Sequence, residues 1–263
     1  MTKQLSDATL GAVGITLADA IWYVASAGML WLAFYVLFRR FLRPRKVIPR
    51  SPTGRQVRGE ILLSLRSLAV FGLMALVVRY ASLSGHTRLY RDVAEYGWPW
   101  FVASIAIAIV IHDAYFYWTH RLLHHPAMFR RMHRTHHLSA NPTPWAAYAF
   151  GSGEAIVQAG IGPVVVCLVP IHPAAFALFM VWQIVFNVFG HCGYEIFPRW
   201  FLRTWVGQLL NTPTHHALHH EKVRGCYGLY FNIWDRLMGT NHPDYRARFE
   251  HATSGGRGEP VAP

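Results

Sequence analysis

The chain has 263 residues, of which 53% are hydrophobic and only 14% are charged. An average soluble domain carries about 25% charged residues, so this composition argues against an ordinary soluble protein and favours a membrane protein. The net charge is +12, and the 16 histidines outnumber the 13 carboxylates, which is hard to explain as surface decoration.

Three apolar segments in the first half of the chain fit the roughly 20 residues that a bilayer core requires. Residues 20–38 contain no charge, and residues 61–78 contain only Arg66, whose long side chain can reach the headgroups. Residues 98–111 start a third span that continues into HDAYFYWTH. No cleavable signal peptide is evident, so the first run is interpreted as a span.

The stretch between the first two spans, residues 39–58, holds eight Arg and Lys and no acid. The positive-inside rule places it in the cytoplasm, and the third span then returns to the cytoplasm near His120. A nucleic-acid patch is the alternative, but a position between two spans favours anionic lipid headgroups, and we expect no nucleic-acid partner.

Residues 155–190 are apolar throughout and are interrupted by Pro163, Pro170 and Pro173. They are compatible with two short spans or one re-entrant hairpin. Histidines occur both before and after this segment, and they can share a site only if it does not cross the membrane once. We therefore predict a hairpin with both ends on the cytoplasmic side.

Two histidine motifs follow the third span. In HRLLHH (120–125), His120 and His124 lie one turn apart on the same face of a helix. In HRTHH (133–137), His133, His136 and His137 have the spacing i, i+3, i+4, which predicts one side of a helical turn.

Two polar residues precede the first motif on the same helix. Asp113 shares the face of His120, and its carboxylate could hold a ligand imidazole by the second N–H. His112 lies about 12 Å along the axis from His120 and is rotated off that face, so it is the weaker ligand candidate.

A third candidate site is Asn187 with His191, spaced i, i+4 at the inner end of the last span. The fourth is NTPTHHALHHEK (211–222), where the i, i+3, i+4 pattern recurs and His215 falls outside it as a supporting residue. The repeated pattern comprises His216, His219 and His220.

The number of candidate ligands limits the metal chemistry. Eight histidines in the three motifs and His191 make nine, whereas one zinc ion takes four ligands. Nine suits two metals with about four or five nitrogens each. Imidazole binds iron, copper, zinc and nickel alike, so the residue types alone predict two transition metals. The other histidines, among them His86 and His172, are interpreted as ordinary packing or surface residues.

In order and spacing, these motifs resemble the fatty acid hydroxylase / sterol desaturase superfamily of integral-membrane di-iron oxygenases over roughly residues 100–245. The resemblance is carried by HDAYFYWTHRLLHHP, MHRTHH, NPTPWAAYAF, FGHCGYEIFP, THHALHH and YGLYFNIWDRLMGTNHP. We expect an all-α, multi-pass bundle of about four transmembrane helices with a cytosolic helical cap that holds the dimetal site. We divide the chain into membrane helices and basic loop (1–97), catalytic domain (98–245) and flexible tail (246–263).

The resemblance implies two non-haem irons, with zinc as a possible substituted metal, that use O₂ to hydroxylate or desaturate a lipid. Asn187 would be a ligand or a supporting residue, and Asp235 in WDRLMGT would support a ligand histidine or pair with Arg236. One departure is Gly151, where many relatives carry a histidine, although Glu154 is retained. The implied ligands are His120, His124, His133, His136, His137, His191, His216, His219 and His220.

Oxidation of a C–H bond needs electrons, and the chain contains neither a GxGxxG nucleotide loop nor a Cys-x-x-Cys cluster. A separate donor such as a ferredoxin or small cytochrome is therefore implied. It could dock on basic residues beside the site, although the same residues could bind lipid headgroups. These residues are Arg121, Arg130, Arg131 and Arg134.

Two other functions stay open at this stage. A membrane zinc hydrolase or isomerase could reuse the histidines, although the chain has no HExxH motif and so lacks the usual base between two zinc ligands. A non-catalytic metal or lipid carrier would need no electron donor. The sequence does not identify the lipid, the choice between hydroxylation and desaturation, or the oligomeric state.

Overall fold

The computed structural model describes residues 2–254, and all regular secondary structure in that range is helical, as expected from the sequence. The α-helices are α1 (Thr2–Trp31), α2 (Arg39–Leu42), α3 (Gly54–Leu83), α4 (Gly97–Leu123), α5 (Pro126–Met132), α6 (Ser152–Ala159), α7 (Ile161–Leu168), α8 (Pro173–Gly190), α9 (Trp205–Leu209), α10 (Pro213–Lys222), α11 (Ile233–Leu237) and α12 (Tyr245–Thr253). Short 3-10 helices cover Arg43–Arg45, Val93–Glu95, His136–Leu138, Pro144–Tyr148 and Phe201–Arg203, and a π-helical turn covers Leu32–Leu37.

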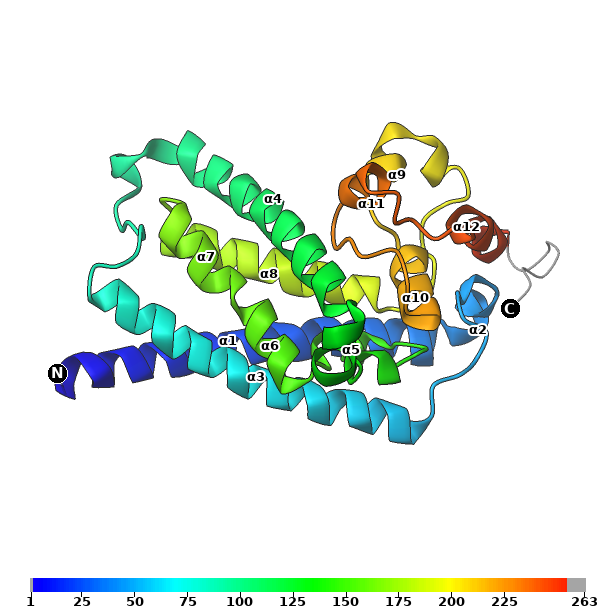
Figure 1. The fold of residues 1–263 in the computed structure, drawn as a ribbon, viewed down its shortest axis with the longest axis horizontal. Helices are drawn as coiled ribbons and strands as arrows, with labels where there is room; N and C mark the ends of the chain where they lie inside the picture. The colour runs from blue at the N-terminus through cyan, green and yellow to red at the C-terminus, as the bar shows by residue number, and fades with distance from the viewer. Residues whose placement is uncertain (1, 255–263) are drawn as a thin grey trace.

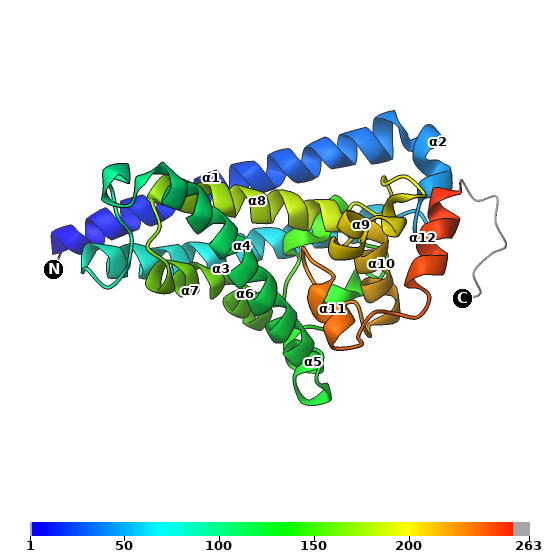
Figure 2. The same cartoon turned by 90° about the horizontal axis from the view of Figure 1, so that it is seen from above.

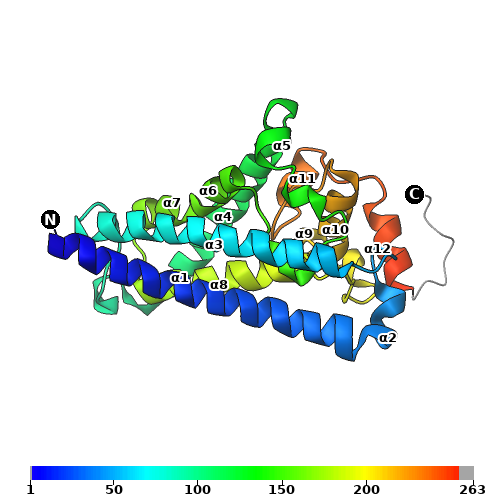
Figure 3. The same ribbon diagram turned by 90° about the horizontal axis from the view of Figure 1, so that it is seen from below.

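Four helices are long and apolar enough to cross a membrane: α1 with its π-helical extension, α3, α4 and α8. α1 and α3 lie side by side along most of their length (Figure 3). Their outer faces carry exposed apolar side chains such as Leu10 (70% exposed) and Leu73 (66% exposed), as expected of surfaces that face lipid. The chain is an integral membrane protein.

The first helix is longer than the apolar run 20–38 that predicted it, because it begins at Thr2. The charge-free run 20–38 begins directly after Asp19. In the structure the helix continues through Asp19, whose carboxylate accepts a hydrogen bond from the hydroxyl of Tyr148 at 3.2 Å. A polar partner inside the fold thus allows a charge within an otherwise apolar helix.

The proline-interrupted segment forms the hairpin predicted from the sequence. α6 and α7 lead away from the histidines, the chain turns at residues 169–172, and α8 returns (Figure 1). Glu154 at the start of the hairpin lies 2.7 Å from the ring of His133, and the ring of His191 at its end lies 5.4 Å from that of His136. Both ends of the hairpin therefore meet the same histidine cluster.

The basic segment 39–58 lies at the histidine end of the bundle, where α2 approaches α12 (Figure 2). Its backbone pairs with the loop that follows α8, since the amide of Val47 donates to the carbonyl of Gly193 at 3.1 Å. The guanidinium of Arg45 donates to the carbonyl of Phe197 at 2.8 Å. The positive charge and the histidines consequently share one end of the molecule.

The structure differs from the expected tail in residues 245–253, which form α12. Phe249 is fully buried, and the side chain of Arg248 forms an ion pair of 3.3 Å with Glu221 at the end of α10. The rest of the expected tail, residues 255–263, lies outside the described residues.

Candidate metal centre

The nine predicted histidines converge on two adjacent groups in which all ligand nitrogens lie within 4.8 Å of one another. The first group consists of His120, His124, His133, His137 and His219. The second group consists of His136, His191, His216 and His220. All are buried except His124, which is partly exposed. No carboxylate belongs to either group in the part of the chain that the structure describes.

Each His-x-x-His-His motif contributes to both groups, which the spacing did not predict. In α10, His216 and His220 belong to the second group, whereas His219 belongs to the first. Successive residues of an α-helix are rotated by about 100°, so His219 and His220 diverge although they are neighbours.

In the motif HRTHH the first and last histidines belong to the first group, which is the reverse of the assignment in α10. His133 and His137 belong to the first group and His136 to the second. The prediction that all three lie on one side of a single helical turn was wrong, because α5 ends at Met132 and a separate 3-10 helix begins at His136.

The rings face one another through their Nε2 atoms. Nε2–Nε2 distances in the first group are 3.1 Å for His120–His133 and His133–His137, and 3.2 Å for His124–His137 and His124–His219. In the second group they are 2.9 Å for His191–His216 and 3.1 Å for His216–His220. Two imidazole nitrogens bound at about 2.1 Å to one metal, at a right angle, lie about 3 Å apart.

Several rings donate their opposite nitrogen, Nδ1, to an acceptor outside the groups. A backbone carbonyl has no proton to offer, so each such Nδ1 carries the hydrogen and leaves a lone pair on Nε2. The pairs are His120 with Tyr227 O (2.9 Å), His219 with Gly225 O (2.8 Å) and His191 with Asn187 O (2.8 Å). Nδ1 of His133 lies 2.7 Å from Glu154 Oε1.

These hydrogen bonds test whether the groups fit a metal. His120 and His219 both point an Nε2 lone pair into the first group, whose ligand atoms lie within 4.8 Å of one another, so the two lone pairs repel each other. A cation between them turns this repulsion into attraction. Hydrogen-bonded Nδ1 atoms are also the arrangement that metal-binding histidines require. The residues present therefore fit two metal ions.

The surroundings keep the rings uncharged. Burial lowers the pKa of His191 to about 4, and burial together with the neighbouring rings lowers the pKa of His124 to about 2 and of His137 to about 3. Ordinary imidazole has a pKa near 6.5. Because a metal binds only the unprotonated nitrogen, all three rings are ready to bind at neutral pH.

Two residues proposed to support the ligands have other partners. The carboxylate of Asp113 accepts from the backbone amides of Tyr230 (2.9 Å) and Phe231 (3.0 Å), so the expectation that it holds the ring of His120 was wrong. Asp113 lies two helical turns from His120, about 10 Å along the axis, which is too far for contact. His112 lies outside both groups and hydrogen-bonds through Nδ1 to the hydroxyl of Tyr230 at 2.9 Å.

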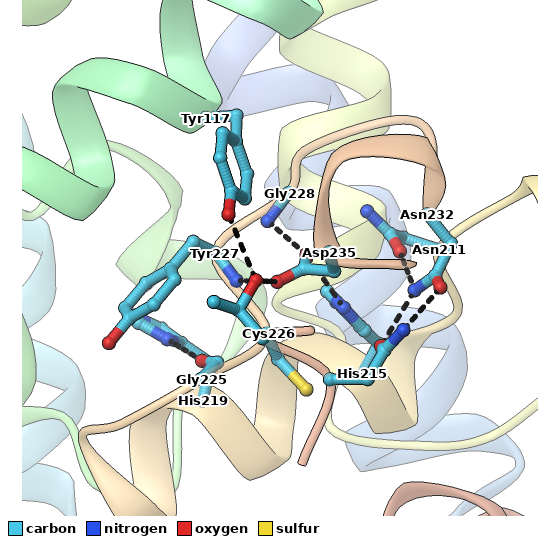
Figure 4. A network of polar contacts seen from close by, with 12 residues as sticks. Tyr117, Asn211, His215, His219, Gly225, Cys226, Tyr227, Gly228, Asn232 and Asp235 are labelled. Atoms are coloured by element: carbon cyan, nitrogen blue, oxygen red, sulfur yellow. Dashed lines mark hydrogen bonds and ion pairs between the residues drawn. The ribbon is translucent and has the colours of Figure 1, made fainter. Parts of the chain in front are cut away.

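His215 is not in either group, although it is buried beside them. Its Nε2 lies 3.2 Å from the carboxylate of Asp235, and Figure 4 shows this contact within a larger network. Asp235 therefore contacts neither of the two partners considered for it, a ligand histidine or Arg236, but a histidine outside both groups. The neighbouring Arg236 instead donates to the carbonyl of Gln208 at 3.2 Å.

Asn187 supports a ligand through its backbone. Its carbonyl accepts from Nδ1 of His191, while its side-chain amide donates to the carbonyl of Ala147 at 2.8 Å. Glu195, which the sequence did not single out, accepts from the amide (3.2 Å) and hydroxyl (2.7 Å) of Thr214 in the first turn of α10. It thereby fixes the start of the helix that carries three of the histidines.

Gly151, where many relatives are expected to carry a histidine, lies just before the first residue of α6. A Cβ added at this position would lie 3.0 Å from the carbonyl oxygen of Met132 at the end of α5. A side chain would require α5 to move by a few tenths of an ångström. Since His133 follows directly, glycine here is matched to the present position of that ligand.

A largely apolar cavity of about 640 Å³ extends through the membrane helices to this centre. It is lined by residues from α1, α3, α4, α6, α7 and α8. At its inner end lie Phe150, whose ring centroid is 5.1 Å from that of His136, and Asn187, which holds His191. The cavity therefore borders the second group of histidines.

Comparison with known proteins agrees with this geometry. The family model for fatty acid hydroxylase matches residues 105–240. Delta(7)-sterol 5(6)-desaturase ERG3B of Gibberella zeae is 33% identical over 222 residues, which cover 84% of this chain and 65% of that protein. Delta(7)-sterol 5(6)-desaturase erg3C of Aspergillus fumigatus is 31% identical over 238 residues, covering 80% of this chain and 69% of that protein.

Lathosterol oxidase of Mus musculus is 30% identical over 191 residues, which cover 72% of this chain and 62% of that enzyme. The chain thus spans about two thirds of the length of the curated relatives it matches. No solved structure matches it significantly. The region matched by the family model contains all nine histidines of the two groups. The chain belongs to the fatty acid hydroxylase family.

Proposed function

We propose that this protein is a membrane-bound non-haem di-iron oxygenase that hydroxylates or desaturates a lipid with O₂ and external electrons. The observation that carries the proposal is the pair of buried, uncharged histidine groups at the inner end of an apolar cavity. Unactivated C–H bonds require an oxidant that side chains cannot supply, and two bound irons would supply it by activating O₂.

The ligand set favours iron over zinc. Five imidazoles in the first group exceed the four ligands of a typical zinc site. A hydrolytic zinc enzyme also needs a base beside the metal, and neither group contains a carboxylate within residues 2–254. Zinc remains a metal that could replace iron during purification, since imidazole binds both.

The residues of the chain would hold and orient the metals and shield them from water. Nδ1 hydrogen bonds fix the orientation of His120, His219 and His191, and Glu154 lies 2.7 Å from Nδ1 of His133. All four rings are essentially inaccessible to solvent. The apolar cavity would hold the lipid so that one C–H bond faces the second histidine group.

A sterol is the substrate class that we propose to test first. The relatives compared above are named for sterol desaturation or lathosterol oxidation. The cavity volume of about 640 Å³ lies in the range of sites that enclose small molecules. Its wall also carries a hydrogen-bonded series in which Gln183 donates to the Tyr148 hydroxyl at 2.8 Å and Tyr148 donates to Asp19. Such groups could bind a neutral polar head.

We place the histidine end on the cytoplasmic side, and the support is its contact with the basic segment 39–58. The external donor, a ferredoxin or small cytochrome, would dock there. Arg130, Arg131 and Arg134 are exposed beside the ligands and suit an acidic partner. Arg121 is less available, because its guanidinium donates to the Tyr117 hydroxyl at 3.3 Å.

The test combines metal analysis with turnover. Protein purified in detergent, reconstituted in lipid and supplied with ferrous iron, a reduced ferredoxin and lathosterol should bind two irons and consume O₂. Mass spectrometry of the lipid should show the gain of one oxygen or the loss of two hydrogens. The proposal would be overturned if the purified protein contained two zinc ions and, after it was loaded with iron, consumed no O₂.

A further inference from the structure

Asp235 lies outside both histidine groups, but three hydrogen bonds and one ion-pair contact hold its carboxylate close to them. It is fully buried. It accepts from the backbone amides of Tyr227 (3.0 Å) and Gly228 (2.7 Å) and from the hydroxyl of Thr240 (2.6 Å), and it lies 3.2 Å from Nε2 of His215. Figure 4 shows the carboxylate among Tyr227, Gly228 and His215.

Two of these contacts fix a loop that orients metal ligands. The carbonyl of Tyr227 accepts from Nδ1 of His120, and the carbonyl of Gly225 accepts from Nδ1 of His219. Both rings belong to the first group. The loop thus contacts the first metal site through two ligands, whereas the Nδ1 partner of His191 in the second group is on α8.

The loop adopts a backbone conformation that needs support. Cys226 has a φ of 56° and Val223 a φ of 60°, in the left-handed region that residues other than glycine rarely adopt. The amide of Cys226 donates to the carbonyl of Thr240 at 2.7 Å, and the hydroxyl of Thr240 in turn donates to Asp235. A conformation of this kind persists only where its surroundings hold it.

Building on the proposed function, we propose that Asp235 is a positioning residue for one of the two metals. It holds the loop 225–228 so that the Gly225 and Tyr227 carbonyls aim His219 and His120 at the first site. Removing it should weaken the first metal site selectively and leave the second site filled. The prediction is therefore a change in metal stoichiometry, which a general structural role would not produce.

Asp113 provides a matched control. It is also a buried aspartate, and it accepts from the backbone amides of Tyr230 and Phe231, a few residues further along the same segment. The carbonyls of Gly225 and Tyr227 are not held by it. Asp113→Asn therefore makes the same chemical change, but it affects the backbone contacts at Tyr230 and Phe231. It leaves the contacts of the loop 225–228 unchanged.

The experiment is an anaerobic titration of the full-length, metal-free protein in detergent with ferrous iron, comparing wild type, Asp235→Asn and Asp113→Asn. An asparagine amide nitrogen cannot accept, so Asp235→Asn loses the contacts of one carboxylate oxygen. We expect wild type and Asp113→Asn to bind two irons. Asp235→Asn should bind one normally and the other about 10- to 100-fold more weakly, the usual loss for an outer partner of a metal ligand.

A double-mutant cycle identifies the weakened site. His219→Ala removes a ligand of the first group and His216→Ala one of the second. Adding Asp235→Asn to His219→Ala should change iron binding little, whereas adding it to His216→Ala should remove the remaining tight site. Equal weakening of both sites in Asp235→Asn, or two tight sites, would overturn the assignment.

Two outcomes separate this inference from the proposed function. If the wild type binds two irons but oxidises no lipid, only the proposed function fails, and the stoichiometry still tests Asp235. If the wild type binds no iron, both fail. Should Asp235→Asn not fold, Thr240→Val removes one of its four contacts. We then expect a weaker loss confined to the first site, and an unchanged titration would contradict the inference.

Discussion

The Nε2 atoms of His120 and His133 face each other across 3.1 Å, while Nδ1 of His133 lies 2.7 Å from a carboxyl oxygen of Glu154. Glu154 is buried at the start of the hairpin, so one contact joins a proposed metal ligand to helix α6. A carboxylate beside the second ring nitrogen makes a ligand histidine a better electron donor.

Replacing Glu154 should weaken the first metal site. Glu154→Leu removes the carboxyl group beside Nδ1 of His133 and should lower iron affinity at that site by about 10- to 100-fold. Glu154→Gln keeps an acceptor oxygen and should lose less. Iron bound per chain at limiting free iron is the measurement. Gln158→Leu, one helical turn further along α6, serves as the control, and equal effects of Gln158→Leu and Glu154→Leu would contradict the prediction.

Replacing a histidine of either group should remove the metal of that group and leave the metal of the other group bound. His137→Ala and His219→Ala each remove a ligand of the first group, and His216→Ala removes one of the second. We expect each single variant to retain one tightly bound iron while lipid oxidation is lost in all of them, because the chemistry needs both metals. A double variant that lacks one histidine from each group should retain no tightly bound iron.

The control for this series is His172→Ala, because His172 lies at the start of α8 outside both groups. It should keep both irons. Lipid oxidation in His137→Ala or His219→Ala at the wild-type rate would show that the reaction does not depend on these ligands.

Filling the cavity should block the substrate without disturbing the metals. Gly162 lines the cavity, and a Cβ added there meets no atom within 4 Å. Gly162→Trp should therefore raise KM for the lipid about tenfold or more while two irons remain bound, since a loss of about 1.4 kcal/mol in binding corresponds to a factor of ten. Substrate titration in reconstituted membranes measures it.

Gly14 on α1 provides the matched control, because an added Cβ also meets no atom within 4 Å and the residue does not line the cavity. Gly14→Trp should leave KM unchanged. If both tryptophan variants raise KM equally, the effect comes from the membrane helices in general and not from occupation of the cavity.

Lys46 should make stability depend on pH in the alkaline range. Burial lowers the pKa of its amine to about 8, from an ordinary value near 10.5 in the unfolded chain. Between those values the unfolded chain binds a proton that the folded protein does not, so the free energy of unfolding rises with pH. Lys46→Met should lack this rise, because methionine does not titrate.

The measurement is thermal unfolding in detergent at pH 7.5 and pH 9.5. Relative to Lys46→Met, the wild type should gain melting temperature at the higher pH. Lys46 also lies over the rings of Tyr35 and Tyr194, 5.3 and 5.0 Å from their centroids, so the two proteins can differ at pH 7.5 for that reason. An identical pH dependence in both would contradict the lowered pKa.

The position of the membrane helices and the identity of the nine histidines could be predicted from the sequence, because both depend on local patterns. A long run of apolar residues indicates a transmembrane helix, and this does not depend on the segments that pack against it. Similarly, the i, i+4 spacing of His120 and His124, or of His216 and His220, places two rings on one helical face and predicts that they share a group. Both pairs do so in the structure.

The contacts that connect distant segments could not be predicted in this way. Asp113 has the spacing of a partner for His120 but binds the backbone of Tyr230, more than a hundred residues later. The acceptors for His120 and His219 are carbonyls of an irregular loop, and every residue has a carbonyl. Sequence patterns therefore contain no signal for them.

The sequence by itself determined an all-helical membrane protein with nine histidines spaced to bind two metals. Only the tertiary structure decided which histidines share a metal, since His136 and His137 are adjacent in the chain yet belong to different groups. It also placed Asp235 against the loop 225–228 and Glu154 against the ring of His133, from separate segments. The physical reason is range: helical spacing fixes the direction of a side chain within a few residues, whereas a metal site depends on packing between segments that lie far apart in the chain.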